Sequence, residues 1–143
     1  MQTNDTTAPD LRPTGACAVA GVLGALAVGL GAFGAHGLKK WLETDPDAAL
    51  RLSWWSTATH YHLAHALLAA VFAVVLALSP SSSAAAKRAR TGLLLVVVGT
   101  VLFSGSLYVM TLTNARILGA VTPFGGLALI AAWVMLALLG RRR

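Results

Sequence analysis

Charged residues are scarce in this sequence, where Asp, Glu, Lys and Arg together make up 11% of 143 residues. In a soluble domain about a quarter of the residues are charged, whereas 57% of this chain is hydrophobic. The composition therefore excludes an ordinary soluble domain and indicates a membrane protein. Cysteine is nearly absent as well. Because Cys17 stands alone, no disulfide forms within these residues, and cysteine usage gives no information on the redox compartment.

Acidic residues are the scarcer of the two charge types, with five against eleven basic residues and a formal net charge of +6. In a soluble chain that excess would suggest nucleic-acid binding. Here the basic residues flank apolar segments, where they act as anchors and topology signals. We therefore expect the lipid bilayer as the partner of this chain, and no nucleic acid.

The sequence contains long apolar segments that carry no charged residue. Four uncharged segments are each long enough to cross the ~30 Å hydrocarbon core as a helix. We expect these spans at residues 15–38, 53–78, 91–112 and 117–140. The sequence thus predicts an all-α fold, an integral membrane bundle of four transmembrane helices within residues 14–143. The polar residues 1–13 are expected to form a disordered tail.

The first span has a competing interpretation as a cleaved signal peptide. Its apolar run is longer than the usual signal core of about 7 to 15 residues, and only Arg12 precedes it. These flanks favour a retained helix. The connection that follows, residues 39–51, carries six charged side chains, so we expect it at the membrane interface with Trp41 at headgroup depth.

The stretch WWSTATHYHLAHALL, residues 54–68, places polar chemistry in a segment that is otherwise suited to lipid. Read as a helix, it puts Trp54, Tyr61 and His65 on one face. His62 lies on the flank of that face, and His60 points elsewhere. Tyr61 and His65 are one turn apart and should contact each other.

Alternation of direction places the polar residues of all four spans at one side of the membrane. The end of one span and the start of the next share a membrane face, whereas the opposite halves hold almost only Ala, Val, Leu and Gly. Because lipid cannot satisfy hydroxyl and imidazole groups, we expect them to form a polar pocket inside one leaflet. The candidate pocket residues are His36, Tyr61, His62, His65, Ser104, Ser106, Tyr108 and Thr122.

Basic residues predict the orientation of the chain. The tail, the second loop and the C-terminus hold seven, namely Arg12, Lys87, Arg88, Arg90, Arg141, Arg142 and Arg143. The other side holds four, which are Lys39, Lys40, Arg51 and Arg116. Because basic residues remain in the cytoplasm, both termini are expected there, in a multi-pass protein of the cell (inner) membrane. The polar pocket would then lie in the outer leaflet.

Three chemistries are open to the histidines. His62 and His65 could share a metal ion or haem, but no Asp, Glu or Cys lies near mid-membrane to complete the ligand set. His65 and Tyr61 could carry protons or bind a quinone carbonyl. Neutral histidines could instead tie helices together through hydrogen bonds of about 0.6 kcal/mol each. The third is favoured, so no metal or catalytic residue is assigned and the cofactor is unknown.

Four motifs follow one another along most of the chain, at residues 31–38 (GAFGAHGL), 57–67, 102–108 and 121–126. Together they resemble the successive motifs of the domain of unknown function 423 family, which includes the transmembrane protein 256-like proteins. The resemblance implies a small four-helix membrane protein, and it brings no established activity, cofactor or substrate. The polar tail and the loop at residues 81–86 look specific to this chain.

The functional expectation is a non-enzymatic accessory or small-ligand-binding membrane component. The alternative is a transporter or redox-linked component that uses His65 and Tyr61 for proton or quinone chemistry. A transporter of this size would need to oligomerise in order to enclose a path, so a homo-oligomer is possible.

Overall fold

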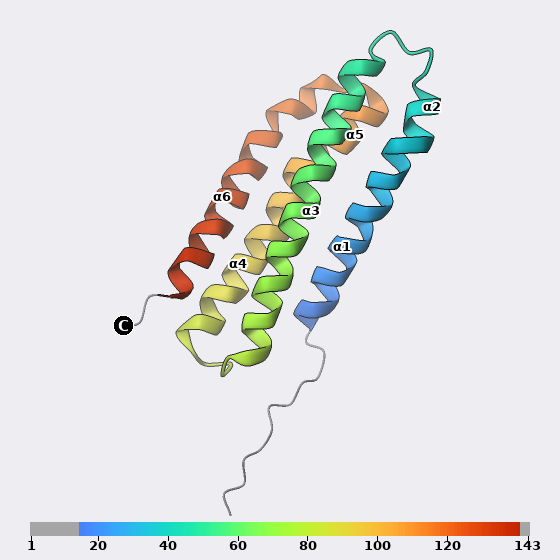
Figure 1. Cartoon of the computed structure of the whole chain (residues 1–143). Coiled ribbons are helices and arrows are strands. Elements are labelled where there is room, and N and C mark those ends of the chain that lie inside the picture. The colour runs from blue at the N-terminus through green and yellow to red at the C-terminus, as the bar shows by residue number, and fades with distance from the viewer. Residues whose placement is uncertain (1–14, 141–143) are drawn as a thin grey trace, which may run out of the picture.

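A computed structural model describes residues 15–140, which are almost entirely helical (Figure 1). Among them are four helices that are long and apolar enough to cross a membrane, so the predicted fold class is confirmed. These continuous helices are Gly15–Trp41, Ala48–Leu78, Ala84–Thr113 and Arg116–Leu139. The predicted tail at residues 1–13 lies outside the described residues.

Local irregularities divide these spans into shorter elements. The first comprises α1 Gly15–Phe33, the π-helical segment η1 Gly34–Leu38 and α2 Lys39–Trp41, and the second is α3 Ala48–Leu78. The third comprises α4 Ala84–Thr100, the π-helical segment η2 Val101–Gly105 and α5 Ser106–Thr113. The fourth comprises the 3₁₀ turn η3 Arg116–Ala120 and α6 Thr122–Leu139.

Side-chain capping and turn chemistry set the ends of the helices. The Asp45 carboxylate accepts from the Asp47 amide at 2.8 Å, forming an Asx turn around Pro46 before α3 begins. The Ser83 hydroxyl accepts from the Ala86 amide at 3.1 Å and caps α4. After α5, Asn114 adopts the left-handed conformation, with φ 56°, which turns the chain back for the last span.

The four spans form an open row rather than a closed ring. The extensive packing is α1 with α3, α3 with α4 and α5, and α4 with α6. In Figure 1, α1 and α6 accordingly lie on opposite sides of the central pair formed by α3 and the third span. Neighbours in the row share the extensive interfaces, and α3 also reaches α6 through single side chains, as the hydrogen bond from Trp133 to His65 shows.

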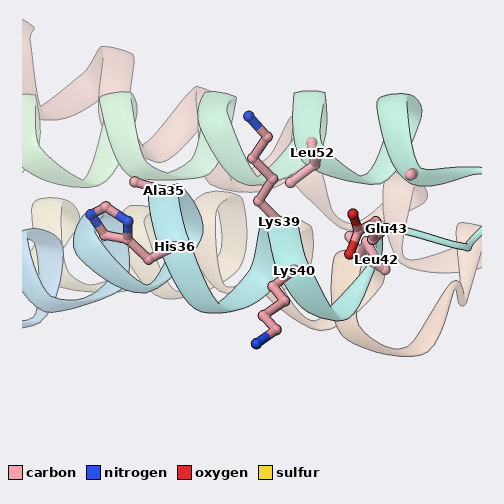
Figure 2. A pocket seen from close by; sticks show the side chains of 8 residues that line it. Ala35, His36, Lys39, Lys40, Leu42, Glu43 and Leu52 are labelled. Atoms are coloured by element: carbon pink, nitrogen blue, oxygen red, sulfur yellow. The ribbon is translucent and has the colours of Figure 1, made fainter.

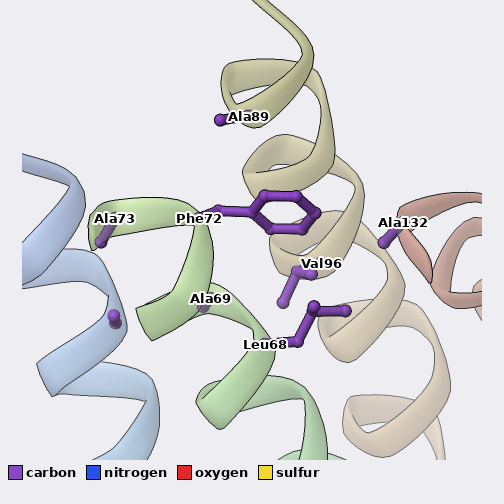
Figure 3. Packing of buried hydrophobic residues seen from close by; sticks show 8 residues of the cluster. Leu68, Ala69, Phe72, Ala73, Ala89, Val96 and Ala132 are labelled. Atoms are coloured by element: carbon purple, nitrogen blue, oxygen red, sulfur yellow. The ribbon is translucent and has the colours of Figure 1, made fainter. Parts of the chain in front are cut away.

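The apolar core fills the half of the molecule near the loop between α3 and α4. The Phe72 ring is fully buried and lies with Leu68 and Val96 between α3 and α4, and α6 contributes Ala132 (Figure 3). A Cβ atom at Gly92 would lie 2.3 Å from the Phe72 ring, so the ring packs directly on the α4 backbone. The buried histidines and serines lie in the other half, beside two smaller apolar clusters that contain Leu42 and Leu107.

Candidate functional site

Most of the predicted pocket residues lie on three neighbouring elements of the other half. His62 and His65 lie on α3, Ser104 on η2, and Ser106 and Tyr108 on α5. Both histidines are 5% exposed and Ser104 is 1% exposed, so these polar groups are inside the protein. Thr122 begins α6 and approaches from the far side of the third span.

His65 has a hydrogen bond at each ring nitrogen. Its Nδ1 lies 2.7 Å from the carbonyl oxygen of Tyr61, and a carbonyl only accepts, so Nδ1 carries the proton. Nε2 accepts from the indole N–H of Trp133 at 3.2 Å. Because that N–H faces Nε2, the arrangement fits the neutral imidazole and not the imidazolium ion. His65 therefore ties α3 to α6 as a neutral side chain.

His62 contacts the third span but is only half satisfied. Its Nδ1 lies 3.3 Å from the Tyr108 hydroxyl, with the ring centroids 6.1 Å apart. Its Nε2 is buried and has no hydrogen-bond partner among residues 15–140. The hydroxyls of Ser104 and Thr100 are likewise buried without a partner in the described part of the chain. His62 is therefore the buried imidazole with hydrogen-bonding capacity to spare.

Ser106 and Thr122 join α5 to α6. The Ser106 hydroxyl donates to the Phe103 carbonyl at 2.9 Å, the Thr122 hydroxyl donates to the Leu118 carbonyl at 3.5 Å, and the two hydroxyl oxygens are hydrogen-bonded to each other at 2.9 Å. Beside this pair the two backbones touch, because a Cβ at Gly125 would lie 2.3 Å from the Phe103 amide nitrogen. The serine predicted as a pocket residue is thus part of a close helix–helix seam.

Two of the predicted residues, Tyr61 and His36, are exposed rather than interior. The Tyr61 side chain is 46% exposed and packs on Phe103, with ring centroids 4.5 Å apart, and stacks over His65 at 6.0 Å. His36 is exposed on η1, at the edge of the row formed by α1. The structure therefore brings His62 to Tyr108 and Ser106 to Thr122, whereas His36 meets neither pair.

Trp55 is an interior residue that the helical-face analysis missed. Its indole N–H donates to the Leu30 carbonyl at 2.9 Å, and a Cβ at Gly34 would lie 2.4 Å from the same ring. The ring centroids of Trp55 and Tyr108 are 4.6 Å apart, so Trp55 joins α1 to α5 across α3. The signal in the sequence was its spacing of three from Ala58 and seven from His62, which are also buried.

Both π-helical segments lie in this polar half. The η1 segment contains His36 and follows the Leu30 carbonyl that accepts from Trp55, and η2 contains the buried Ser104. π-helical turns inside α-helices are rare and are often found at functional sites. Their positions therefore mark the same half of the molecule as the histidines do.

Arg51 forms a second polar centre that the sequence analysis assigned only to an interfacial connector. It is 6% exposed, and its guanidinium donates to the carbonyls of Thr111 at 2.7 Å and Leu112 at 3.1 Å. It also pairs with the Asp45 carboxylate. The guanidinium satisfies carbonyls at the end of α5, where the negative end of the helix dipole favours a cation. In the sequence, the signal for this centre was that Asp45 and Arg51 both lie just before the second span.

Asp47 links the two connections at this end of the molecule. Its carboxylate accepts from the Asn114 amide at 3.2 Å and from the Arg116 guanidinium at 2.9 Å. The Asn114 hydrogen bond first, and then the Arg116 hydrogen bond, lower the pKa of Asp47 below its ordinary value. This network holds the first connection against the third.

A metal site needs several ligand atoms that converge on one ion. Within residues 15–140 no three or more His, Cys, Asp or Glu side chains are placed to hold one ion. His65 already uses both of its nitrogens, which leaves Nε2 of His62 as the interior imidazole atom open to another group. That nitrogen can donate or accept a hydrogen bond, according to the tautomer of His62.

Fold and site together define a small four-span α-helical membrane protein with a polar half and an apolar half. The sequence profile of a family described as protein of unknown function (DUF423) matches residues 30–126, and the chain belongs to this family. The resemblance identified from the motifs is thereby confirmed. The matched region includes both π-helical segments and the whole of α3.

The chain is similar to proteins named UPF0382 membrane proteins from several organisms. The UPF0382 membrane protein YwdK of Bacillus subtilis is 47% identical over 78% of this chain and 83% of its own length. The UPF0382 membrane protein of Staphylococcus haemolyticus is 41% identical over 80% of this chain and 88% of its own. One from Schizosaccharomyces pombe is 42% identical over 80% and 92%, respectively. No solved structure matches the chain significantly.

Proposed function

We propose that this protein is a non-enzymatic accessory component of the cell membrane that binds a small hydrogen-bonding ligand at its polar half. The observation that carries the proposal is His62, a buried imidazole whose Nε2 has no partner among the described residues. Leaving such a group unsatisfied costs about 1 to 3 kcal/mol. A ligand that bonded to Nε2 would recover that free energy.

The chemistry of the ligand follows from the two tautomers of His62. If the Tyr108 hydroxyl donates to Nδ1, Nε2 is a donor, and if Nδ1 donates to that hydroxyl, Nε2 is an acceptor. A hydroxyl group can serve either state because it both donates and accepts. A small molecule with a hydroxyl and an apolar body suits a site that lies inside a membrane protein.

The other polar side chains support a binding role over a catalytic one. Both ring nitrogens of His65 take part in hydrogen bonds, and Ser106 and Thr122 are bonded to each other. An activated serine needs a base within hydrogen-bond reach, and Ser104 has no such partner among residues 15–140. The cluster thus offers recognition and helix packing.

The proposal is tested by purifying the protein in mild detergent and identifying co-purifying small molecules by mass spectrometry. His62→Leu removes the open nitrogen, and His60→Leu is the matched control, because His60 is exposed on the same helix and bonds only to its own turn. We expect one compound in the wild type and the control that is lost from His62→Leu. The same set of compounds in all three proteins would contradict ligand binding at His62.

A second candidate function, quinone binding or proton transfer, rests on the exposed ring of Tyr61 stacked over His65. A flat ring could dock from the lipid against Tyr61 and Phe103. His65→Gln keeps hydrogen-bonding ability but cannot titrate near neutral pH. If the second candidate holds, this variant folds normally and loses any bound quinone or proton-linked phenotype. Wild-type behaviour of the variant argues against this candidate.

A further inference from the structure

We propose that the groove between the first span and α3 binds a phospholipid whose headgroup is a phosphodiester with no positive charge. This site goes beyond the proposed function, because it lies at the α1 edge of the row and is lined by neither His62 nor Tyr108. It is made by η1, α2 and the start of α3, at the end of the molecule that carries the first connection (Figure 2).

The upper part of the groove is a cavity of about 640 Å³ with charged and apolar walls. Its charged and titratable lining residues are Lys39, Lys40, Glu43 and His36, all from the first span and its end. From α3 it receives only the apolar side chains of Ala48 and Leu52. Two lysines against one glutamate leave a net positive charge, and Figure 2 shows the Lys39 side chain extending toward Leu52 of α3 while Lys40 extends to the opposite side of α2. Lys39 is therefore the cation that faces α3, and Lys40 adds positive charge to the rim.

The groove continues from this cavity toward the centre of the membrane. A second cavity of about 230 Å³ shares Ala35 and Leu52 with the first and is also lined by Gly31 and Trp55. A third, of about 280 Å³, lies further along the same two helices between Gly21 and Gly24 of α1 and the apolar face of α3. The glycines keep the groove open, because a Cβ at Gly21, Gly24 or Gly31 would meet nothing within 4 Å.

The groove is positively charged at one end and apolar along the rest of its length, so an anion with an apolar tail is complementary to it. A free phosphate would use Lys39 and Lys40 but not the cavities beside Gly31 and Gly24. A phospholipid fills both parts, with its phosphate at the lysines and an acyl chain along α1. Lysine and arginine side chains at the membrane surface attract anionic headgroups. A headgroup hydroxyl could also donate to Glu43, whereas a choline or ethanolamine cation would be repelled by Lys39 (Figure 2).

The charge requirement is tested by native mass spectrometry of the purified protein titrated with phosphatidylglycerol or phosphatidylcholine. We expect phosphatidylglycerol to bind at least about tenfold more tightly, and Lys39→Gln with Lys40→Gln to abolish that preference, given the usual contribution of a lysine to anionic-lipid binding. Lys87→Gln with Arg90→Gln makes the same charge change at the other end of the molecule. Equal affinity for both lipids, or an equal loss in the Lys87 and Arg90 variant, would overturn the proposal.

The groove itself is tested with a pair of glycine variants. Gly31→Leu places a side chain in the second cavity, whereas Gly29→Leu adds the same side chain on α1 where Gly29 lines none of the three cavities. We expect Gly31→Leu to weaken phosphatidylglycerol binding about tenfold and Gly29→Leu to leave it unchanged. Displacement of the lipid by millimolar glycerol phosphate would show that the acyl chain is not recognised, which also overturns the proposal. His62→Leu should keep the lipid, so this site and the proposed function fail independently.

Discussion

His65 is placed near the centre of its span, where an unsatisfied polar group is expensive and a charged one more so. Two hydrogen bonds offset this cost. His65 bonds to the Tyr61 carbonyl on the same helix and accepts from the Trp133 indole N–H on α6. The first partner could be foreseen from the helical spacing of four. The second lies 68 positions away in sequence, and no local pattern reports it.

Replacement of His65 should therefore separate a packing role from hydrogen bonding. We expect His65→Leu to lower the free energy of unfolding in detergent by about 1 kcal/mol, since it leaves the Tyr61 carbonyl and Trp133 indole with one partner fewer. His65→Gln should lose less, because an amide both donates and accepts. Thermal unfolding of both variants, each also combined with Trp133→Phe, measures the coupling. Additive losses in the double variants would mean that the two side chains do not interact.

At the scale of elements, the sequence predicted the spans more accurately than the helix ends. The second span was expected from residue 53 and the third from residue 91, yet α3 begins at Ala48 and α4 at Ala84. Hydropathy reports the part of a helix that lies in hydrocarbon, and charged residues such as Arg51 and Lys87 extend a helix past it. The π-helical segments were not predicted, because a change from i→i+4 to i→i+5 bonding leaves no periodic signal in so few residues.

The seam between α6 and η2 predicts different effects for two adjacent glycines. A Cβ at Gly125 would lie 2.3 Å from the Phe103 amide nitrogen and 2.8 Å from the Leu102 carbonyl carbon, and backbone atoms cannot rotate away. A Cβ at Gly126 would make only ordinary contacts, at 3.7 Å from the Phe103 ring. We expect Gly125→Ala to destabilise by about 1 to 3 kcal/mol and Gly126→Ala to be neutral or mildly stabilising. Thermal unfolding in detergent compares them, and equal stabilities would show that the seam is not rigid.

The contact between the two connections predicts a pH dependence. The pKa of Asp47 is lowered by the Asn114 and Arg116 hydrogen bonds, so its carboxylate stabilises the fold above its ordinary pKa. That stabilisation is lost as the pH falls through the lowered pKa of the folded state. The thermal stability of the wild type should thus decline on acidification below about pH 4.

Asp47→Asn is the variant that tests this dependence, because an amide cannot titrate. Its stability at neutral pH should be lower than that of the wild type, and the decline in acid should be shallower. Glu43→Gln makes the same acid-to-amide change within the first connection and serves as the control. A wild-type acid decline in Asp47→Asn, measured by thermal unfolding across the pH series, would assign the dependence to other groups.

At the scale of the whole molecule, the alternating direction of the four spans predicts how deep each polar residue lies in the membrane. It does not predict which spans are neighbours. The eight predicted pocket residues belong to the half of the molecule that carries two connections, the one between α2 and α3 and the one after α5. The row order α1, α3, third span, α6 nevertheless separates His36 at one edge from Thr122 at the other. Lateral order depends on which helix surfaces pack together, as Gly34 does on Trp55 and Gly125 on Phe103, and those pairings join distant positions of the chain.

Orientation in the membrane is the remaining property of the whole molecule, and the distribution of basic residues predicts it. The side with the N-terminus, the loop between α3 and α4 and the C-terminus holds seven Lys and Arg residues, against four on the other side. Of those four, Arg51 is buried against the end of α5, and Arg116 is exposed and paired with Asp47. We therefore predict that both termini are cytoplasmic, which places the His62 cluster and the lipid groove in the outer leaflet.

Alkaline phosphatase fusions test this orientation, because the enzyme is active only outside the cytoplasm. A fusion after Arg143 should be inactive, and one inserted after Thr44, in the first connection, should be active. Cysteine labelling gives an independent check: Ser82→Cys should be reached only by permeant reagents and Thr44→Cys also by impermeant ones, since both positions are exposed. Variants in the Cys17→Ser background exclude the native thiol, which is exposed as well. Activity after Arg143 together with impermeant labelling at position 82 would invert the molecule and move its polar half to the cytoplasmic leaflet.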